Sequence, residues 1–545
     1  MPDESLPPAS PAPSSGMTKN DTICIVLIGV LASAAAGLLI NAYVSNIDLI
    51  SYISISQRYL HGSLRDAVNA YWSPLFSWLL LPFLLLPVEP VIAAKLLSFL
   101  TGLLLVFSVF LFSRRLGVDF VVRAGLALVM AGIVVLCYAF VVQTPDLLGA
   151  SLVMFYLMAV FEPGKRPGGG NGAMAGLWGG LAFLAKHYNF FFVLIHLPAT
   201  HLILWLSTRD RHERTRILRR FVSASAVFLA LSGSWIGMIS LKYGRLTISS
   251  AGRININCLN PDTPGHAIEK LGLLEPPDSM SISAWEDPTL YPIPGWNPFQ
   301  SGSSRLYFLK LVIRNLKDFW RVLAEWSFLS FPILLIAFIQ VIRGPGRRFL
   351  LFALATVAVY SSGYVMIGVL NRYLLPVLTL IALMGAIILQ GIRRHPGLDR
   401  PAIRAGLLIF YLFSLSVTPA SYISRYMNNH RTFYIDSIKN TDRQIYQVGR
   451  ALKRMDYLQG RVASNGCLTP SLILAYYLRL SYLGQLKRGG TMEEWEDEIK
   501  RFKPDFFLLW IDAEEKYPFL RGRPEITKGR IPELRVYDLR KTGFP

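Results

Sequence analysis

The chain has 545 residues, of which 52% are hydrophobic and only 17% are charged, and its mean hydropathy is +0.40. This composition excludes a set of soluble domains and is typical of a polytopic membrane protein, because runs of about 18 or more apolar residues mark bilayer spans. The net charge of +20 could suggest a nucleic-acid partner. The basic residues sort with membrane topology instead, so no nucleic acid is expected.

The order of apolar segments predicts a mainly α fold with about eleven transmembrane helices. The first 21 residues are rich in Pro and Ser and are expected to form a disordered cytoplasmic tail. A transmembrane domain then covers residues 22–421. Its predicted spans are residues 22–42, 89–112, 120–142, 147–161, 173–186, 189–206, 221–241, 319–341, 349–366, 373–391 and 404–421.

Basic residues gather in alternate connections between these spans, and the positive-inside rule then fixes the orientation. Seventeen cations lie on one side, namely Arg114, Arg115, Lys165, Arg166, the six arginines from Arg209 to Arg220, Arg343, Arg347, Arg348, Arg393, Arg394, Arg400 and Arg404. We therefore expect a cytoplasmic N-terminus. Residues 43–88, 242–318 and everything after about residue 421 are expected on the outer face.

After the last span the pattern changes to that of a small α/β domain over residues 422–545. Thr491 and Glu494 are spaced as a capping box, and "PDFFLLWID" is typical of a short buried strand. Cys258 and Cys467 both fall on the expected outer face, so either a disulfide or two thiols would fit. The histidines do not cluster and no zinc-binding spacing is present, so no metal site is expected from spacing.

Five ionisable residues lie at or near the outer ends of predicted spans: Asp48, Lys95, Asp146, Lys186 and Arg372. Cations at outer helix ends run against the positive-inside rule, and charges at a membrane edge are costly enough to indicate function. Plainer roles also fit. Asp48 and Asp146 suit the first turn of a helix, and the cations suit interfacial anchoring.

Aromatic and acidic residues of the outer segments form a second group of candidates. Tyr71 and Trp72 suit either an interfacial aromatic belt or a surface that stacks on a sugar. The segment "SAWEDPTLYPIPGWNPF" brings Glu286 and Asp287 next to tryptophans, a mixture that suits sugar binding or a proline-stiffened lid.

Several of these features, taken in span order, resemble the GT-C glycosyltransferases. They are Asp48 after the first span, the segment ending "YLHGSL", "NAYWSPLFSWLLLPF", Asp146 before the fourth span, the lysine in "GLAFLAKHYNF" and "NRYLLP". This superfamily includes the dolichyl-phosphate-mannose protein mannosyltransferases and the bacterial lipid A aminoarabinose transferases. The resemblance implies a donor sugar on a polyprenyl phosphate and a role for Asp48 in activating the acceptor. The chain departs from the pattern at Trp72, Ser73, Pro74 and Leu75, where many members have Lys-Pro-Pro-Leu.

Transfer from a lipid phosphate needs a carboxylate to deprotonate the acceptor hydroxyl and cations to hold the departing phosphate. We therefore expect Asp48, with Asp146, to be catalytic and Arg372, Lys186 and Lys95 to bind phosphate. The sequence does not decide whether a divalent cation binds between the two aspartates. The acceptor is a glycan, lipid or protein, and the expected location is the bacterial inner membrane, with the site on the periplasmic or extracellular side.

Two other classes of protein remain as alternatives. A secondary transporter of a polar or lipid-linked substrate would also have many spans, but such proteins usually show repeated halves and midplane charges. The sequence shows no such repeat. A non-catalytic membrane scaffold would leave the charges at the outer helix ends unexplained.

Overall fold

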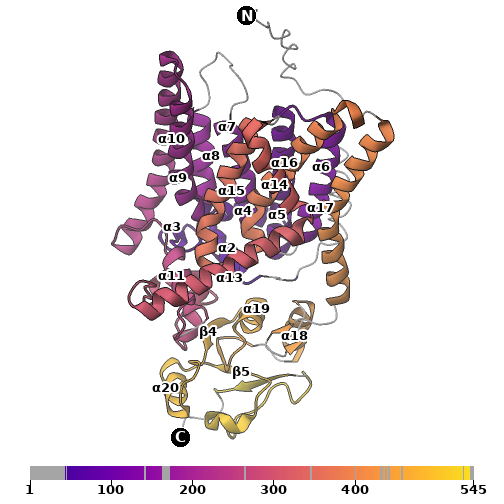
Figure 1. The fold of residues 1–545 in the computed structure, drawn as a ribbon. Helices are drawn as coiled ribbons and strands as arrows, with labels where there is room; N and C mark the ends of the chain where they lie inside the picture. The colour runs from indigo at the N-terminus through magenta and orange to yellow at the C-terminus, as the bar shows by residue number, and fades with distance from the viewer. Residues whose placement is uncertain are drawn as a thin grey trace, which may run out of the picture.

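A bundle of helices and a small α/β domain are stacked end to end in the computed structural model, with the C-terminus at the far end of the α/β domain (Figure 1). The predicted tail and the first predicted span lie outside the described residues. The structure describes residues 43, 46–139, 143–161, 172–262, 265–343, 346–398, 400–429, 434–435, 438–439, 442–455, 458–531 and 533–540.

The bundle contains several helices that can cross a membrane. Among the described residues, five are long and apolar enough: α5 (Pro90–Arg115), α9 (Tyr188–Ser207), α10 (Arg211–Tyr243), α15 (Arg347–Ile367) and Asn371–Arg393, which joins η4 (Asn371–Leu374) to α16 (Leu375–Arg393). Shorter apolar segments lie beside them: α6 (Phe120–Ile133) with the π-helical η1 (Val134–Ala139), α7 (Asp146–Val160), α8 (Gly172–Ala185) and the part Pro401–Val417 of α17 (Pro401–Asn429). The prediction of a mainly helical, polytopic membrane protein is confirmed.

The predicted span at residues 319–341 is wrong as a single helix. The chain forms α13 (Gly302–Trp326) and α14 (Ser330–Arg343), whose axes are bent by 102°. At the break Ser327 has extended backbone angles, and its Oγ accepts a hydrogen bond from the Leu329 amide at 3.2 Å. A side-chain acceptor of this kind competes with the helical hydrogen bond, so the serine ends α13 although hydropathy continues across it.

The segment between the first two predicted spans is also helical, as α2 (Asp48–Leu60), α3 (Leu64–Ala67) and α4 (Pro74–Leu84). Pro74 begins α4, a position where its fixed φ suits a helix and its missing N–H is not needed. Hydrogen bonds from Ser56 Oγ to the Ser77 carbonyl at 3.0 Å and from Ser77 Oγ to the Tyr52 carbonyl at 3.2 Å join α2 to α4. These bonds hold the helix that begins with Asp48 against the bundle.

Glycines set the close approach of α8 to α10. A Cβ added at Gly172 would lie 2.4 Å from the carbonyl oxygen of Arg220, and one at Gly176 would lie 2.2 Å from that of Ala224. A Cβ added at Gly180, four residues further on, would lie 2.8 Å from Cδ1 of Leu231. A repeat of small residues at this spacing lets two membrane helices approach closely. The packing fixes α8, whose C-terminal end leads to Lys186.

The α/β domain, which we call the tail domain, contains a four-stranded sheet in the order β4-β3-β5-β6. Strand β3 pairs in parallel with β4 and β5, and β6 is antiparallel to β5. The strands are β3 (Arg461–Ser464), β4 (Ser481–Gln485), β5 (Phe506–Trp510) and β6 (Leu534–Asp538), and the helical segments are α18 (Asp442–Met455), α19 (Leu468–Leu478), α20 (Met492–Phe502), η6 (Glu514–Lys516) and η7 (Pro518–Leu520). A separate hairpin joins β1 (Tyr434–Ile435) and β2 (Ile438–Lys439). The predicted strand, now β5, is fully buried, and the predicted capping box begins α20.

Residues 244–301, which we call the connecting loop, run from α10 to α13 and pack against the tail domain. The loop contains α11 (Ala251–Cys258), α12 (Ala267–Lys270), η2 (Ala284–Glu286) and η3 (Pro288–Leu290). The Tyr482 amide of β4 donates to the Ile282 carbonyl, and the Leu274 amide donates to the Leu483 carbonyl, both at 2.7 Å. The loop therefore pairs with the free edge of β4.

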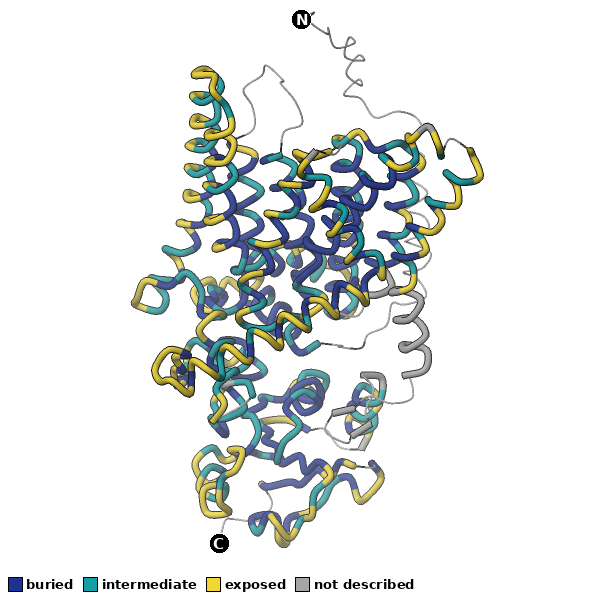
Figure 2. Tube along the Cα trace, in the orientation of Figure 1, coloured by how far each residue is buried: buried dark blue, intermediate teal, exposed yellow. Residues whose placement is uncertain are grey.

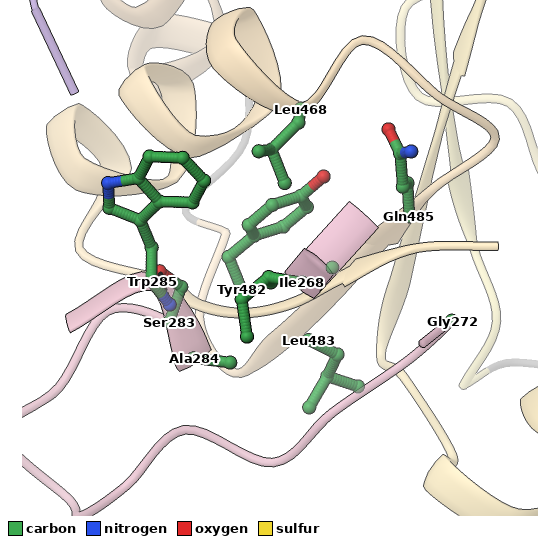
Figure 3. Close-up of a pocket in the computed structure, with 10 residues that line it drawn as sticks. Ile268, Gly272, Ser283, Ala284, Trp285, Leu468, Tyr482, Leu483 and Gln485 are labelled. Atoms are coloured by element: carbon green, nitrogen blue, oxygen red, sulfur yellow. Dashed lines mark hydrogen bonds between the residues drawn. The ribbon is translucent and has the colours of Figure 1, made fainter. Parts of the chain in front are cut away.

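A pocket lies at this contact and takes its walls from both sides (Figure 3). Its labelled lining residues are Ile268, Gly272, Ser283, Ala284 and Trp285 from the loop and Leu468, Tyr482, Leu483 and Gln485 from the tail domain. The Cys258 thiol donates to the Ile254 carbonyl at 3.2 Å, and no disulfide joins it to Cys467. The contact between loop and tail domain thus depends on hydrogen bonds and side-chain packing rather than on that bridge.

Candidate functional site

Four of the predicted site residues meet at one edge of the bundle, and we call them the rim cluster: Asp48, Asp146, Lys186 and Arg372. Arg372 Nη2 lies 3.3 Å from Asp48 Oδ2, and Arg372 Nε lies 3.8 Å from Asp146 Oδ2. Lys186 Nζ contacts Asp146 Oδ1. Two carboxylates and two cations from four distant parts of the chain thus form one connected ion-pair network.

Helix ends position each member of the rim cluster. Asp48 and Asp146 are the first residues of α2 and α7, where the helix dipole favours a negative charge. The Asp48 amide donates to Asn46 Oδ1 at 2.9 Å, and Thr144 Oγ1 donates to Asp146 Oδ2 at 2.5 Å. The helix-start role weighed for both aspartates therefore coexists with their place in the cluster.

The side chains of the rim cluster are mostly buried, but most of them keep some exposure to solvent. The Asp146 side chain is 6% exposed, whereas those of Asp48, Lys186 and Arg372 are 16%, 20% and 20% exposed. Charges interact more strongly in such a partly dry environment than in water. The cluster can thus hold strong ion pairs while three of its members remain within reach of a ligand.

Tyrosines form a wall beside the two cations. Lys186 Nζ lies 3.8 Å from the centre of the Tyr373 ring, and Arg372 Cζ lies 5.2 Å from it. Tyr364 stacks on Tyr373 at 5.0 Å and on Tyr188 at 3.9 Å. Cation–π contact of this kind stabilises the positive charges without neutralising them.

The tyrosine wall and the hydrogen bond that Ser73 makes beside Lys186 were not predicted from the sequence. Tyr188 and Tyr373 adjoin the quoted lysine and arginine and could have been noticed, but Tyr364 comes from α15 and no local pattern marks it. Ser73, which stands within the departure from the superfamily pattern, accepts a hydrogen bond from the His187 amide at 2.9 Å. It therefore supports the turn that follows Lys186.

Tyr71 and Trp72 pack against the connecting loop rather than forming an outward-facing belt. Trp72 Nε1 donates to the Trp285 carbonyl at 3.2 Å, and Tyr71 Oη lies 3.4 Å from His266 Nε2. Burial, followed in effect by the negative charge of Asp48, raises the pKa of Tyr71 well above its usual value. Tyr71 and Trp72 are therefore held against the connecting loop.

Glu286 and Asp287 hold the connecting loop on the bundle. Glu286 is fully buried and accepts hydrogen bonds from Arg58 Nη2 at 2.6 Å and from the Ile282 amide at 2.5 Å. Burial raises the pKa of Glu286 to about 7, and the Arg58 charge opposes this rise. Asp287 Oδ2 accepts from Lys242 Nζ at 3.0 Å and from Tyr243 Oη at 2.7 Å. Both carboxylates are therefore engaged away from the rim cluster.

The remaining candidate cation, Lys95, is buried within the first two turns of α5. A metal ion between Asp48 and Asp146 does not fit the arrangement, because the Arg372 guanidinium lies against both carboxylates. Across the described residues, no group of three or more His, Cys, Asp or Glu side chains could hold a metal ion. The rim cluster is thus held together by the side-chain cations Lys186 and Arg372 rather than by a metal ion.

No protein-family model and no curated protein sequence matches the chain. Among solved structures, it is similar to ArnT from Cupriavidus metallidurans bound to undecaprenyl phosphate, with a TM-score of 0.55 and 13% identity over 96% of this chain and 99% of that one. The apo state of that protein gives a TM-score of 0.53 and 14% identity over 95% of this chain and 98% of that one.

The archaeal oligosaccharyltransferase AglB from Archaeoglobus fulgidus, in complex with an inhibitory peptide and a dolichol-phosphate, gives a TM-score of 0.50 and 10% identity over 91% of this chain and 70% of that one. At such low identity the likeness establishes the fold alone. The likeness to ArnT extends over nearly the full length of both chains, and so includes the tail domain as well as the bundle. The expected resemblance is confirmed at this level: the chain has the GT-C membrane fold.

Proposed function

We propose that this protein transfers a sugar from a polyprenyl-phosphate donor to an acceptor hydroxyl on the outer face of the membrane, with Asp48 as the general base. The observation that carries the proposal is the rim cluster, which brings carboxylates and cations together at the edge of a membrane bundle. A site at that edge lets the lipid part of a donor stay in the bilayer while its head group meets the acceptor.

The ion pairs of the rim cluster suggest how the base becomes available. The two aspartates balance the charges of Lys186 and Arg372. A donor phosphate would compete with Asp48 for Arg372, whose planar fork matches phosphate oxygens. Engagement of Arg372 by the donor would thus release Asp48 and let its carboxylate accept a proton.

In the proposed step, Asp48 takes the proton of the acceptor hydroxyl as the acceptor oxygen bonds to the anomeric carbon of the sugar. The bond between that carbon and the phosphate oxygen breaks, and its electron pair leaves with the lipid phosphate. Positive charge on Arg372 and Lys186 stabilises the departing phosphate. Asp146, which contacts both cations, holds them in position.

Two features of similar proteins support the choice of donor. ArnT was solved with undecaprenyl phosphate, and AglB was solved with a dolichol-phosphate and a peptide. Both ligands include a polyprenyl phosphate, the leaving group that the proposed reaction would release. Lys95, Tyr71 and Trp72 remain proposed contacts for the substrates, and we assign Glu286 and Asp287 to holding the connecting loop.

Comparing cells with and without the protein tests this function. Mass spectrometry would measure polyprenyl-phosphate sugars and the glycans of the cell surface. We expect one lipid-linked sugar to accumulate and one modified glycan, lipid or protein to lose that sugar when the protein is absent. Unchanged levels of both would contradict the proposal.

A further inference from the structure

Helix α13 carries three distinct faces along its length. One face packs on the bundle through buried residues that recur every three or four positions: Leu311, Asn315, Phe319, Val322 and Trp326. Asn315 Nδ2 also donates a hydrogen bond to the Val365 carbonyl of α15 at 2.9 Å. This face fixes the orientation of the helix and so determines where the other two faces point.

The second face is apolar yet exposed. Its residues are between 43% and 55% exposed, and they are Leu306, Leu309, Ile313, Leu316 and Trp320. The Trp320 ring contacts Phe331 of α14 at 6.0 Å, and Phe331 and Phe338 of α14 are themselves 61% and 68% exposed. The apolar face of α13 thus continues the exposed apolar surface of a membrane helix. An exposed apolar surface that continues from a membrane helix is suited to contact with lipid acyl chains.

The third face is a basic stripe of four exposed residues: Lys310, Arg314, Lys317 and Arg321. Their spacing of four, three and four places them on one side of the helix, about a quarter turn from the apolar face. Arg321 pairs with Asp318 within α13 at 3.0 Å. Within the described residues, no ion pair is recorded for the other three cations of the stripe. Their charge is therefore available to an anionic partner.

The position of α13 in the molecule accounts for its having an apolar face next to a basic stripe. The helix crosses the bundle beside the tail domain, and the 102° bend turns α14 away from it into the bundle (Figure 1). Exposed and buried residues alternate along α13, as expected for a helix packed on one side only (Figure 2). A helix with adjacent apolar and basic faces is suited to the boundary between acyl chains and head groups.

We propose that α13 lies in the membrane interface and that its basic stripe binds the phosphate groups of anionic phospholipids. Each Lys or Arg near an anionic bilayer surface contributes about 1 kcal/mol, which corresponds to about a fivefold change in binding. The three cations without a recorded ion pair should together change the preference for anionic lipid by at least tenfold. The inference is independent of the proposed transfer reaction.

Native mass spectrometry of the purified full-length protein, with added phosphatidylglycerol or phosphatidylcholine, tests the stripe. We expect the wild-type protein to retain phosphatidylglycerol in preference to phosphatidylcholine. The combined variant Lys310→Gln, Arg314→Gln and Lys317→Gln should lose most of that preference. The matched control Arg488→Gln, Lys500→Gln and Arg501→Gln makes the same change in net charge on the exposed surface of the tail domain and should keep it.

Photocrosslinking tests the depth of α13 separately. We expect p-benzoylphenylalanine at Ile313 to crosslink to lipid in nanodiscs, whereas the same probe at the exposed Met492 of α20 should not. Equal lipid preference in the stripe variant and the wild type would overturn the binding proposal, as would wild-type protein with no preference. No lipid crosslink at Ile313 would overturn the interfacial placement, and capture of another protein there would indicate a protein partner instead.

Discussion

Replacing Arg372 perturbs the centre of the rim cluster. Its guanidinium lies 3.3 Å from Asp48 and 3.8 Å from Asp146, so it is the group that joins the two carboxylates. If a donor phosphate takes the place of a carboxylate on this fork, two charge-assisted hydrogen bonds form together. An ammonium group cannot reproduce that planar geometry.

The expected magnitude follows from the loss of one such bond. A hydrogen bond to a charged group contributes about 1.5 to 3 kcal/mol, which corresponds to a factor of about 10 to 150 in rate. We therefore expect Arg372→Lys to lower kcat/KM by at least about tenfold and Arg372→Ala to lower it further. The assay is transfer from a synthetic short-chain polyprenyl-phosphate sugar by the purified protein in nanodiscs.

A matched control separates this effect from loss of any paired arginine. Arg394 follows α16 and pairs with Asp119 at 2.8 Å, but its side chain is 62% exposed. Arg394→Lys should leave transfer within about twofold, since exposed ion pairs contribute little. Wild-type transfer in a folded Arg372→Ala protein would refute the phosphate role and leave Arg372 as an interfacial anchor.

Three further predictions concern orientation, metal and pH. A reporter fused after residue 430 should be active outside the cell and one fused after residue 212 inside, and the opposite result would reverse the membrane orientation. Chelation with EDTA should leave transfer unchanged, because a guanidinium rather than a metal ion joins the two aspartates, and a loss restored by Mg²⁺ or Mn²⁺ would disprove this. Burial raises the folded-state pKa of Glu286 to about 7. The protonated side chain therefore stabilises the folded protein at a pH below the ordinary pKa of a glutamate, and this stabilisation is lost as the pH rises through about 7. The Tm should therefore fall between pH 5 and pH 8, and Glu286→Gln should reduce that fall; an equal fall in both proteins would remove Glu286 as its source.

Much of the rim cluster could be predicted from sequence because helix ends are visible in hydropathy. Asp48 and Asp146 each begin a helix, and Lys186 and Arg372 lie beside helix ends, so the topology alone brings them to one edge of the bundle. Their actual pairing depends on rotations of α2, α7 and α8 about their axes. Side-chain packing sets those rotations, and they cannot be read from the order of the apolar segments along the chain.

Other features depend on contacts that no local pattern records. Glu286 looked suited to sugar binding, but its partner Arg58 lies 228 residues earlier in the chain. The break at Ser327 was hidden because apolar residues continue on both sides of it. Hydropathy measures the average character of a segment and does not report the side-chain hydrogen bonds of Ser327 and Ser330 that accompany the end of this helix.

The central claim is that Asp48 accepts the proton of the acceptor hydroxyl, and Asp48→Asn tests it most directly. The amide keeps the size and much of the hydrogen bonding of the carboxylate but cannot act as the base. Removing a general base typically costs about a hundredfold to ten-thousandfold in rate. Asp66→Asn, at an exposed acid of α3, is the matched control for loss of one negative charge.

The decisive measurement is the rate of sugar transfer to a purified acceptor, taken beside equilibrium binding of the donor to the same protein preparation. The account predicts that Asp48→Asn lowers transfer by at least about a hundredfold while donor binding survives, and that Asp66→Asn changes neither. Transfer at the wild-type rate by a folded Asp48→Asn protein would contradict the account, leaving Asp48 as a helix-start acid and Asp146 as the next candidate base.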